Sequence, residues 1–157
     1  MFFIVLAVAT LGGAAAHLAL GSELPVPEER VVEILLLYVL VVFVGIGLFI
    51  GGIWHIFFGR QAALMVGWPA GNPFQRELGW ACLALGAISL LSARFRGTYW
   101  VGPSVAYSVF LLGSAAGHIV EARRMQSALS SHARAVLIVD LIMPIVVLGL
   151  LLLHQRR

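Results

Sequence analysis

The 157-residue chain is 61% hydrophobic and 11% charged, with a mean hydropathy of +1.02 and a formal net charge of +3. This composition is typical of a protein that dissolves in a bilayer and excludes an ordinary soluble domain. Its ten basic residues are all arginines that stand singly or in pairs between apolar runs, so the charge does not predict a nucleic-acid surface. Soluble-enzyme motifs are also missing, since the sequence has no phosphate-binding glycine loop, nucleophile elbow or thiol pair.

Five apolar segments are predicted to span the membrane. Each is long enough to cross about 30 Å of hydrocarbon at about 1.5 Å per residue, although the third is only just so. Helices are the expected form, because lipid offers no partner to an unpaired backbone group and the alternation of barrel strands is absent. The fold class is therefore predicted as all-α: one integral membrane domain, a helical bundle with five transmembrane helices. The spans are residues 2–20, 31–58, 77–93, 99–120 and 135–153.

The first segment, residues 2–20, is predicted to be a true span rather than a signal peptide. Its 19 apolar residues are long for a signal core, and no positively charged region precedes them. The small residues of "AAAHLALGS" keep cleavage open as the alternative. An acidic link at residues 21–33 then leads into the second span.

The longest link, residues 59–76, leads into the most specific local pattern, "GWPAGNPFQRELGW" at residues 67–80. Asn72 is predicted to be the N-cap of the third helix, with Pro73 as its first residue. Gln75 then occupies the third helical position, where it approximates a capping box with Asn72. The pattern therefore predicts a well-capped helix start.

The same pattern also supplies charge and aromatic rings. Glu77 lies in the second turn of the predicted helix, whose amide dipoles favour negative charge nearby. Trp68 and Trp80 suit the water–lipid interface. The link at residues 67–76 therefore has two compatible interpretations, an anchored helix start and a rigid loop that closes a polar pocket.

Short or polar links join the later spans. Residues 94–97, "RFRG", predict a tight turn that makes the third and fourth helices antiparallel neighbours. Residues 121–134 are polar and are expected at the level of the lipid headgroups. Two glycine pairs with GxxxG spacing predict close helix packing, within this chain or with a partner. They are Gly47 with Gly51 and Gly113 with Gly117.

Ionisable residues inside or beside the apolar segments are predicted to meet near one membrane face. If the spans alternate in direction, these residues all lie near side A, the face at which the first span begins. At about 1.5 Å per residue, they fall within about 8 Å of that interface. Ionisable side chains in lipid are costly and usually mark a functional site. The group comprises His55, Glu77, His118 and Asp140, with Gln75 and Arg76 beside Glu77 in the sequence.

Imidazoles and carboxylates together suit several kinds of site, and no catalytic residue is assigned. A divalent metal such as iron, zinc or manganese would find an N/O environment there. Its ligands would be His55, Glu77, His118 and Asp140. The group equally suits a proton relay, a small-ligand pocket that includes Gln75 and Arg76, or a buried polar network without chemistry. A two-haem cytochrome would pair His55 with His118 near side A and His17 with His154 toward side B. It is a weaker alternative, because His17 lies close to a helix end and His154 belongs to the polar tail.

These motifs resemble those of an uncharacterised family of small bacterial multi-pass membrane proteins, classed as a domain of unknown function. The most specific shared stretch is GW-x-x-G-x-PFQ-x-E-x-G at residues 67–79. The resemblance implies a membrane fold and lends no established activity. The similar sequences carry an Asn/Gly-rich link before the last helix, where this chain has "RRMQSALSSHAR". The corresponding positions are His55, Trp68, Pro73, Phe74, Gln75, Glu77, Gly79, His118, Asp140 and Pro144.

Two functions remain open from the sequence. The first is a small multi-pass membrane protein whose polar pocket near side A binds a small ligand, a proton or a metal. The second is a non-catalytic accessory subunit of a larger membrane complex, which the small size and the GxxxG spacings favour. The expected surroundings are the lipid bilayer of a bacterial inner membrane, with a homo-oligomer or a larger complex open as partners and no nucleic acid. The orientation is not predicted, because five arginines fall in the links on each side.

Overall fold

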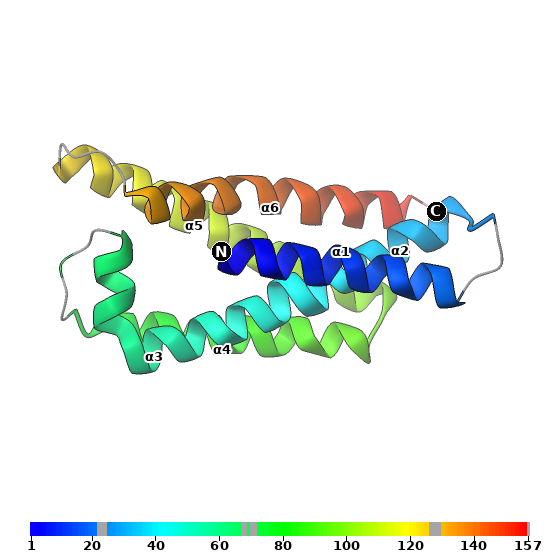
Figure 1. Cartoon of the computed structure of the whole chain (residues 1–157), viewed down its shortest axis with the longest axis horizontal. Helices are drawn as coiled ribbons and strands as arrows, with labels where there is room; N and C mark the ends of the chain where they lie inside the picture. The colour runs from blue at the N-terminus through cyan, green and yellow to red at the C-terminus, as the bar shows by residue number, and fades with distance from the viewer. Residues whose placement is uncertain (22–24, 67–68, 70–71, 126–129, 157) are drawn as a thin grey trace.

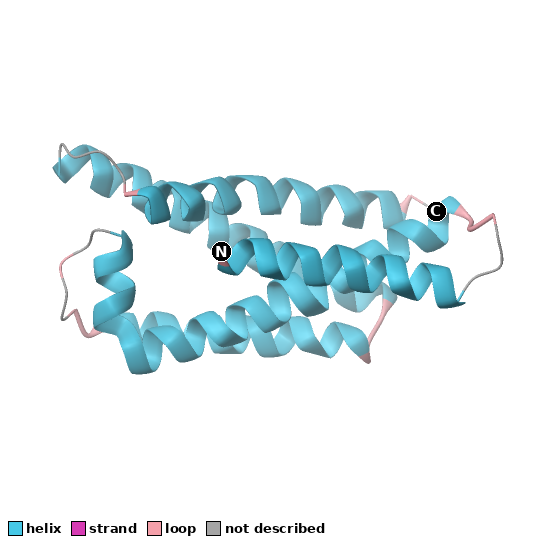
Figure 2. Cartoon of the chain, viewed as in Figure 1, coloured by secondary structure: helices cyan, strands magenta, loops and turns pink. Residues whose placement is uncertain are grey.

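The computed structural model is an elongated helical bundle (Figures 1 and 2), and it describes residues 1–21, 25–66, 69, 72–125 and 130–156. Within these residues the secondary structure is helical and contains no strand, which confirms the all-α prediction. Five helical stretches are long and apolar enough to cross a membrane. Successive stretches run in opposite directions, so side A is the end of the bundle where α3 ends and α4 begins (Figure 1).

The helices follow the predicted spans in order, with longer bounds. Residues 28–66 form one continuous stretch, which makes the second span much longer than predicted. Its middle section is wound as a π-helix, and its last turns lie beyond a kink. In chain order the elements are α1 Phe2–Gly21, α2 Glu28–Tyr38, η1 Val39–Ile46, α3 Gly47–Val66, α4 Phe74–Leu90, η2 Leu91–Ala93, η3 Gly97–Trp100, α5 Val101–Met125 and α6 Ser131–Gln155.

The end of α3 corrects the predicted link at residues 59–76. Phe58 has non-helical dihedral angles, φ −126° and ψ 31°, and the helix resumes through Val66 in a new direction. This final section, residues 59–66, turns across the side A end of the bundle in Figure 1. There the Ser130 hydroxyl donates a hydrogen bond to the carbonyl oxygen of Met65 at 3.0 Å. The first half of the predicted link is therefore a helical strap that joins α3 to the start of α6.

The predicted link at residues 121–134 is also shorter than expected, because the helices on both sides extend into it. Helix α5 continues to Met125 and α6 begins at Ser131, so both ends of the predicted polar link are helical.

The tight turn predicted after α4, at residues 94–97, is confirmed. Gly97 has a φ of +64°, a conformation that a residue with a side chain adopts only with strain.

Glycines set the closest helix contact in the molecule, between α4 and the antiparallel stretch formed by η1 and α3. A Cβ built on Gly52 would lie 2.7 Å from the carbonyl oxygen of Gly79, and one built on Gly86 would lie 3.0 Å from that of Gly45. Within each helix the two glycines are seven residues apart, Gly45 and Gly52 on one and Gly79 and Gly86 on the other. They therefore lie on the same face, about two helical turns apart. Backbone therefore packs directly on backbone along this seam.

The GxxxG pairs do not form this contact, which corrects the predicted role of their spacing within the chain. Gly47 lies against the Leu6 side chain of α1, 2.9 Å from a built Cβ. At Gly51, Gly113 and Gly117 a Cβ would meet no described atom within 4 Å. Gly113 and Gly117 are exposed and Gly51 is half-buried, so none of the three packs closely against a described helix.

An apolar core fills the side B half of the bundle, where α2, η1, η3, the start of α5 and the end of α6 come together. Trp100 is fully buried in it, and its indole N–H donates to the carbonyl oxygen of Ser92 at 3.1 Å. The core residues are Leu36, Leu37, Val39, Leu40, Val44, Trp100, Tyr107, Leu111, Val147 and Leu151. Toward side A the α3–α4 pair and the α5–α6 pair diverge, and the strap at residues 59–66 crosses between them (Figure 1).

Candidate functional site

The predicted site residues fall into two groups that belong to different helix pairs. His55, Gln75, Arg76 and Glu77 lie on the α3–α4 pair, and His118 and Asp140 lie on the α5–α6 pair. Within the described residues, no three His, Cys, Asp or Glu side chains gather closely enough to hold a metal ion. The four-residue metal site therefore has no geometric support, and the two groups are described separately.

In the first group, His55 and Gln75 are hydrogen-bonded across the α3–α4 seam. The Nδ1–H of His55 donates to Oε1 of Gln75 at 2.7 Å, and both side chains are half-buried. This bond holds the proton on Nδ1 and leaves Nε2 as the ring's acceptor. Gln75 faces α3 because it lies one turn before Gly79, which packs on the same helix.

The start of α4 confirms one half of the predicted cap and corrects the other. The backbone N–H of Phe74 donates to Oδ1 of Asn72 at 2.9 Å, and Pro73 has helical dihedral angles. Gln75 is committed to His55, so it does not complete the capping box. Gln75 therefore bonds to His55 of α3 in place of the backbone at the start of its own helix.

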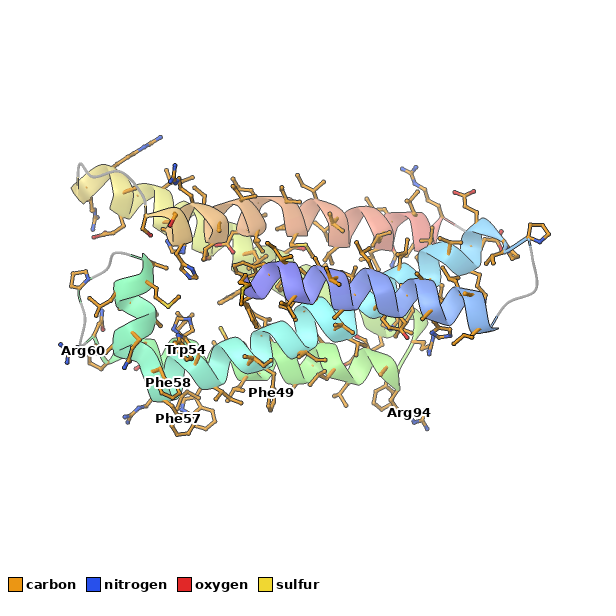
Figure 3. The ribbon with its side chains drawn as sticks, in the orientation of Figure 1. Phe49, Trp54, Phe57, Phe58, Arg60 and Arg94 are labelled. Atoms are coloured by element: carbon orange, nitrogen blue, oxygen red, sulfur yellow. The ribbon has the colours of Figure 1, made fainter. Side chains whose placement is uncertain are left out.

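The neighbours of Gln75 point away from the seam. Arg76 and Glu77 are exposed, because their positions lie about 100° and 200° around the helix from Gln75. Trp68 and most of the link at residues 67–71 lie outside the described residues, so the predicted pocket-closing loop is not tested. The exposed aromatic residues of α3, Trp54, Phe57 and Phe58, gather beside the kink (Figure 3).

Replacing Gln75 with leucine is expected to release the His55 ring from its single tautomer. The Nδ1–H would lose its acceptor, so nitrogen-15 NMR of labelled histidine should show a mixture of neutral tautomers in place of one. Gln61→Leu is the control, since Gln61 is exposed on the strap. An unchanged His55 spectrum in Gln75→Leu would contradict the hydrogen bond.

In the second group, Asp140 is the most buried acidic residue that the structure describes. It is 4% exposed and lies on the face of α6 that packs against α5, one turn before Pro144. The Ser114 side chain of α5 lies within reach of its carboxylate for a polar interaction. Its Oδ2 atom is buried and has no hydrogen-bond partner among the described residues. A buried polar atom without a partner is rare and calls for an explanation.

Two further polar side chains of α5 face the same interface as Asp140. His118 is 6% exposed and lies one turn beyond Ser114 toward side A. Tyr107 is 3% exposed and lies close enough to Asp140 for an electrostatic interaction. The interface between α5 and α6 therefore holds a carboxylate, an imidazole and two hydroxyl groups where the apolar core ends toward side A.

Sequence reasoning found His118 and Asp140 but missed Ser114 and Tyr107. Both lie on the helical face of His118, at four and eleven residues before it. A search of that face for hydroxyl groups, at the period of 3.6 residues, would have found them. The other two histidines of the haem alternative lie elsewhere: His17 packs on Tyr38 and His154 on Trp100.

One known protein family matches the chain over its whole length. A family of unknown function, DUF6790, matches residues 1–157. The chain belongs to this family. No curated protein and no solved structure matches it. The DUF6790 assignment agrees with the expected membership of a family without an established activity, and the site must therefore be interpreted from its own geometry.

Proposed function

We propose that this DUF6790 protein is a multi-pass membrane protein that binds a proton at Asp140, between α5 and α6. The proposal also places it in a bacterial inner membrane, since its motif resembles that of small bacterial membrane proteins. The observation that carries it is the buried carboxylate of Asp140, which is 4% exposed and whose Oδ2 atom has no hydrogen-bond partner among the described residues.

The physical reason is the cost of burying a charge. A carboxylate inside an apolar region is stable when it is protonated or when a cation lies beside it. No arginine is described in contact with Asp140. The ion pair of Arg96 with Glu33 lies near side B. A proton on Oδ2 would remove the charge and turn that atom into a hydrogen-bond donor.

The proton is favoured over the other ligands proposed for this region. A protein-bound metal ion is usually held by three or more ligands, and the described residues offer no such group. His55 and Glu77, which would have completed the metal site, lie on the other helix pair. A proton needs only one carboxylate and a polar neighbour, and both are present.

Labelling with dicyclohexylcarbodiimide tests this function. This apolar reagent modifies carboxyl groups in their protonated form, so a buried protonated aspartate reacts and an ionised surface acid does not. We expect mass spectrometry of the protein in liposomes to locate the adduct on Asp140, with a yield that falls as the pH rises. Asp140→Asn should abolish the adduct.

Glu77→Gln is the matched control, because it removes the exposed acid of the predicted site. Labelling of this variant should equal that of the parent. An unlabelled parent at every pH, or an adduct that persists in Asp140→Asn, would refute the proposal.

A further inference from the structure

The α5–α6 interface is sealed on one side of Asp140. Toward side B, the face of α6 that carries Asp140 continues through Val147 and Leu151, which are 0% and 5% exposed. From α5, Tyr107 and Leu111 pack into the same core, at 3% and 6% exposed. Trp100 closes this region near side B with no exposed surface. This stretch of α5 also carries two buried hydroxyl groups, Ser104 and Ser108, and that of Ser108 donates to the carbonyl oxygen of Ser104 at 2.8 Å. A proton that left Asp140 in this direction would have to cross this close-packed and largely apolar region.

The interface is polar on the other side of Asp140. Toward side A, α5 presents Ser114, His118 and then Glu121, which lie at intervals of four and three residues on one face. Ser114 and Glu121 are only half-buried. The two helix pairs also diverge toward this end, as Figure 1 shows. There the hydrogen bond from Ser130 to Met65 of the strap joins the two pairs.

The remaining charged groups on elements packed against α6 lie at the ends of the bundle. Near side A these groups are Arg60 of α3, Arg123 and Arg124 of α5, and His132 and Arg134 of α6, while His55 of α3 is turned to Gln75 of α4. At side B, α6 ends with His154, whose ring lies against Trp100. Near side B, α2 carries its ionisable residues toward its start, with Tyr38 at its end. Those residues are Glu28, Glu29, Arg30 and Glu33. Tyr107 and His118 are thus the titratable groups described beside Asp140 within the bundle.

We infer that Asp140 exchanges its proton with side A alone, past His118 and Glu121. This inference rests on the proposed function and adds the compartment from which the proton comes. A proton from water at side A adds to the carboxylate and leaves by the same route, because the apolar core blocks the path to side B. Such a site reports the proton activity of one compartment and carries no proton current across the membrane.

The test separates molecules by their orientation in proteoliposomes. In a Cys82→Ala background, Arg124→Cys places a thiol at side A and Arg94→Cys places one near side B, and both arginines are exposed. A membrane-impermeant biotin maleimide added outside then marks only the molecules whose thiol faces outward. Inside and outside pH are set independently, the vesicles are treated with dicyclohexylcarbodiimide, and the biotinylated molecules are captured for mass spectrometry.

We expect the Asp140 adduct of molecules captured through Arg124→Cys to follow the outside pH and to ignore the inside pH. Molecules captured through Arg94→Cys should show the reverse. An adduct that follows the opposite compartment or both compartments would overturn the inference while leaving the proton site intact. An adduct whose yield follows the pH of neither compartment, or the absence of any adduct at every pH, would instead refute the proposed function itself.

Discussion

Replacing Trp100 with alanine is expected to lower the free energy of unfolding by about 3–5 kcal/mol. The indole has no exposed surface, and its N–H donates to the carbonyl oxygen of Ser92 at 3.1 Å. Its ring centroid also lies 5.1 Å from that of the His154 ring. Alanine would remove these contacts and leave a cavity in the apolar core, beside η2 and the end of α6.

Equilibrium unfolding in mixed micelles, followed by circular dichroism, measures this loss. Trp80→Ala is the control, because Trp80 is 61% exposed on α4 and is expected to face lipid. Its removal should change the unfolding free energy by much less than the Trp100 substitution. Equal losses for the two variants would show that Trp100 has no special packing role.

Replacing Gly79 with leucine is expected to separate α3 from α4 and to destabilise the protein by about 1–3 kcal/mol. A Cβ at this position would lie 2.6 Å from Cγ1 of Ile56 and 2.9 Å from the carbonyl oxygen of Gly52. The Ile56 side chain can rotate away, but the backbone oxygen can move only with its helix. The whole seam must therefore open to admit the side chain.

Gly51→Leu is the matched control, since a Cβ at Gly51 would meet no described atom within 4 Å. Both variants are compared by thermal aggregation in detergent, with size-exclusion chromatography to detect opened or associated forms. Gly79→Leu should aggregate at a lower temperature than the parent, and Gly51→Leu should match the parent. If Gly79→Leu were as stable as the parent, backbone contact could not be what holds this seam together.

Local chemistry was enough to predict the helices and their order. A run of apolar residues long enough to cross a bilayer is expected to pair its backbone internally, and the five such runs are found as helices that are long and apolar enough to cross a membrane. The start of α4 and the turn at Gly97 are also predictable from the local sequence. Asn72 accepts a hydrogen bond from the backbone N–H of Phe74, and a glycine adopts the positive φ of the turn without strain. The boundaries of α3 were missed, because residues 59–66 continue as a strap that is held by a contact with α6.

By itself the sequence determined the class of the protein and the identity of its buried ionisable residues, because the preference for lipid and for helix is a property of each segment. Only the tertiary structure decided which polar groups meet. Gln75 bonds to His55 rather than to its own helix, and Asp140 meets Ser114 rather than Glu77. The physical reason is that a side chain's partner depends on the face at which two helices touch. That face is set here by glycines that let the backbones approach, such as Gly52 and Gly79.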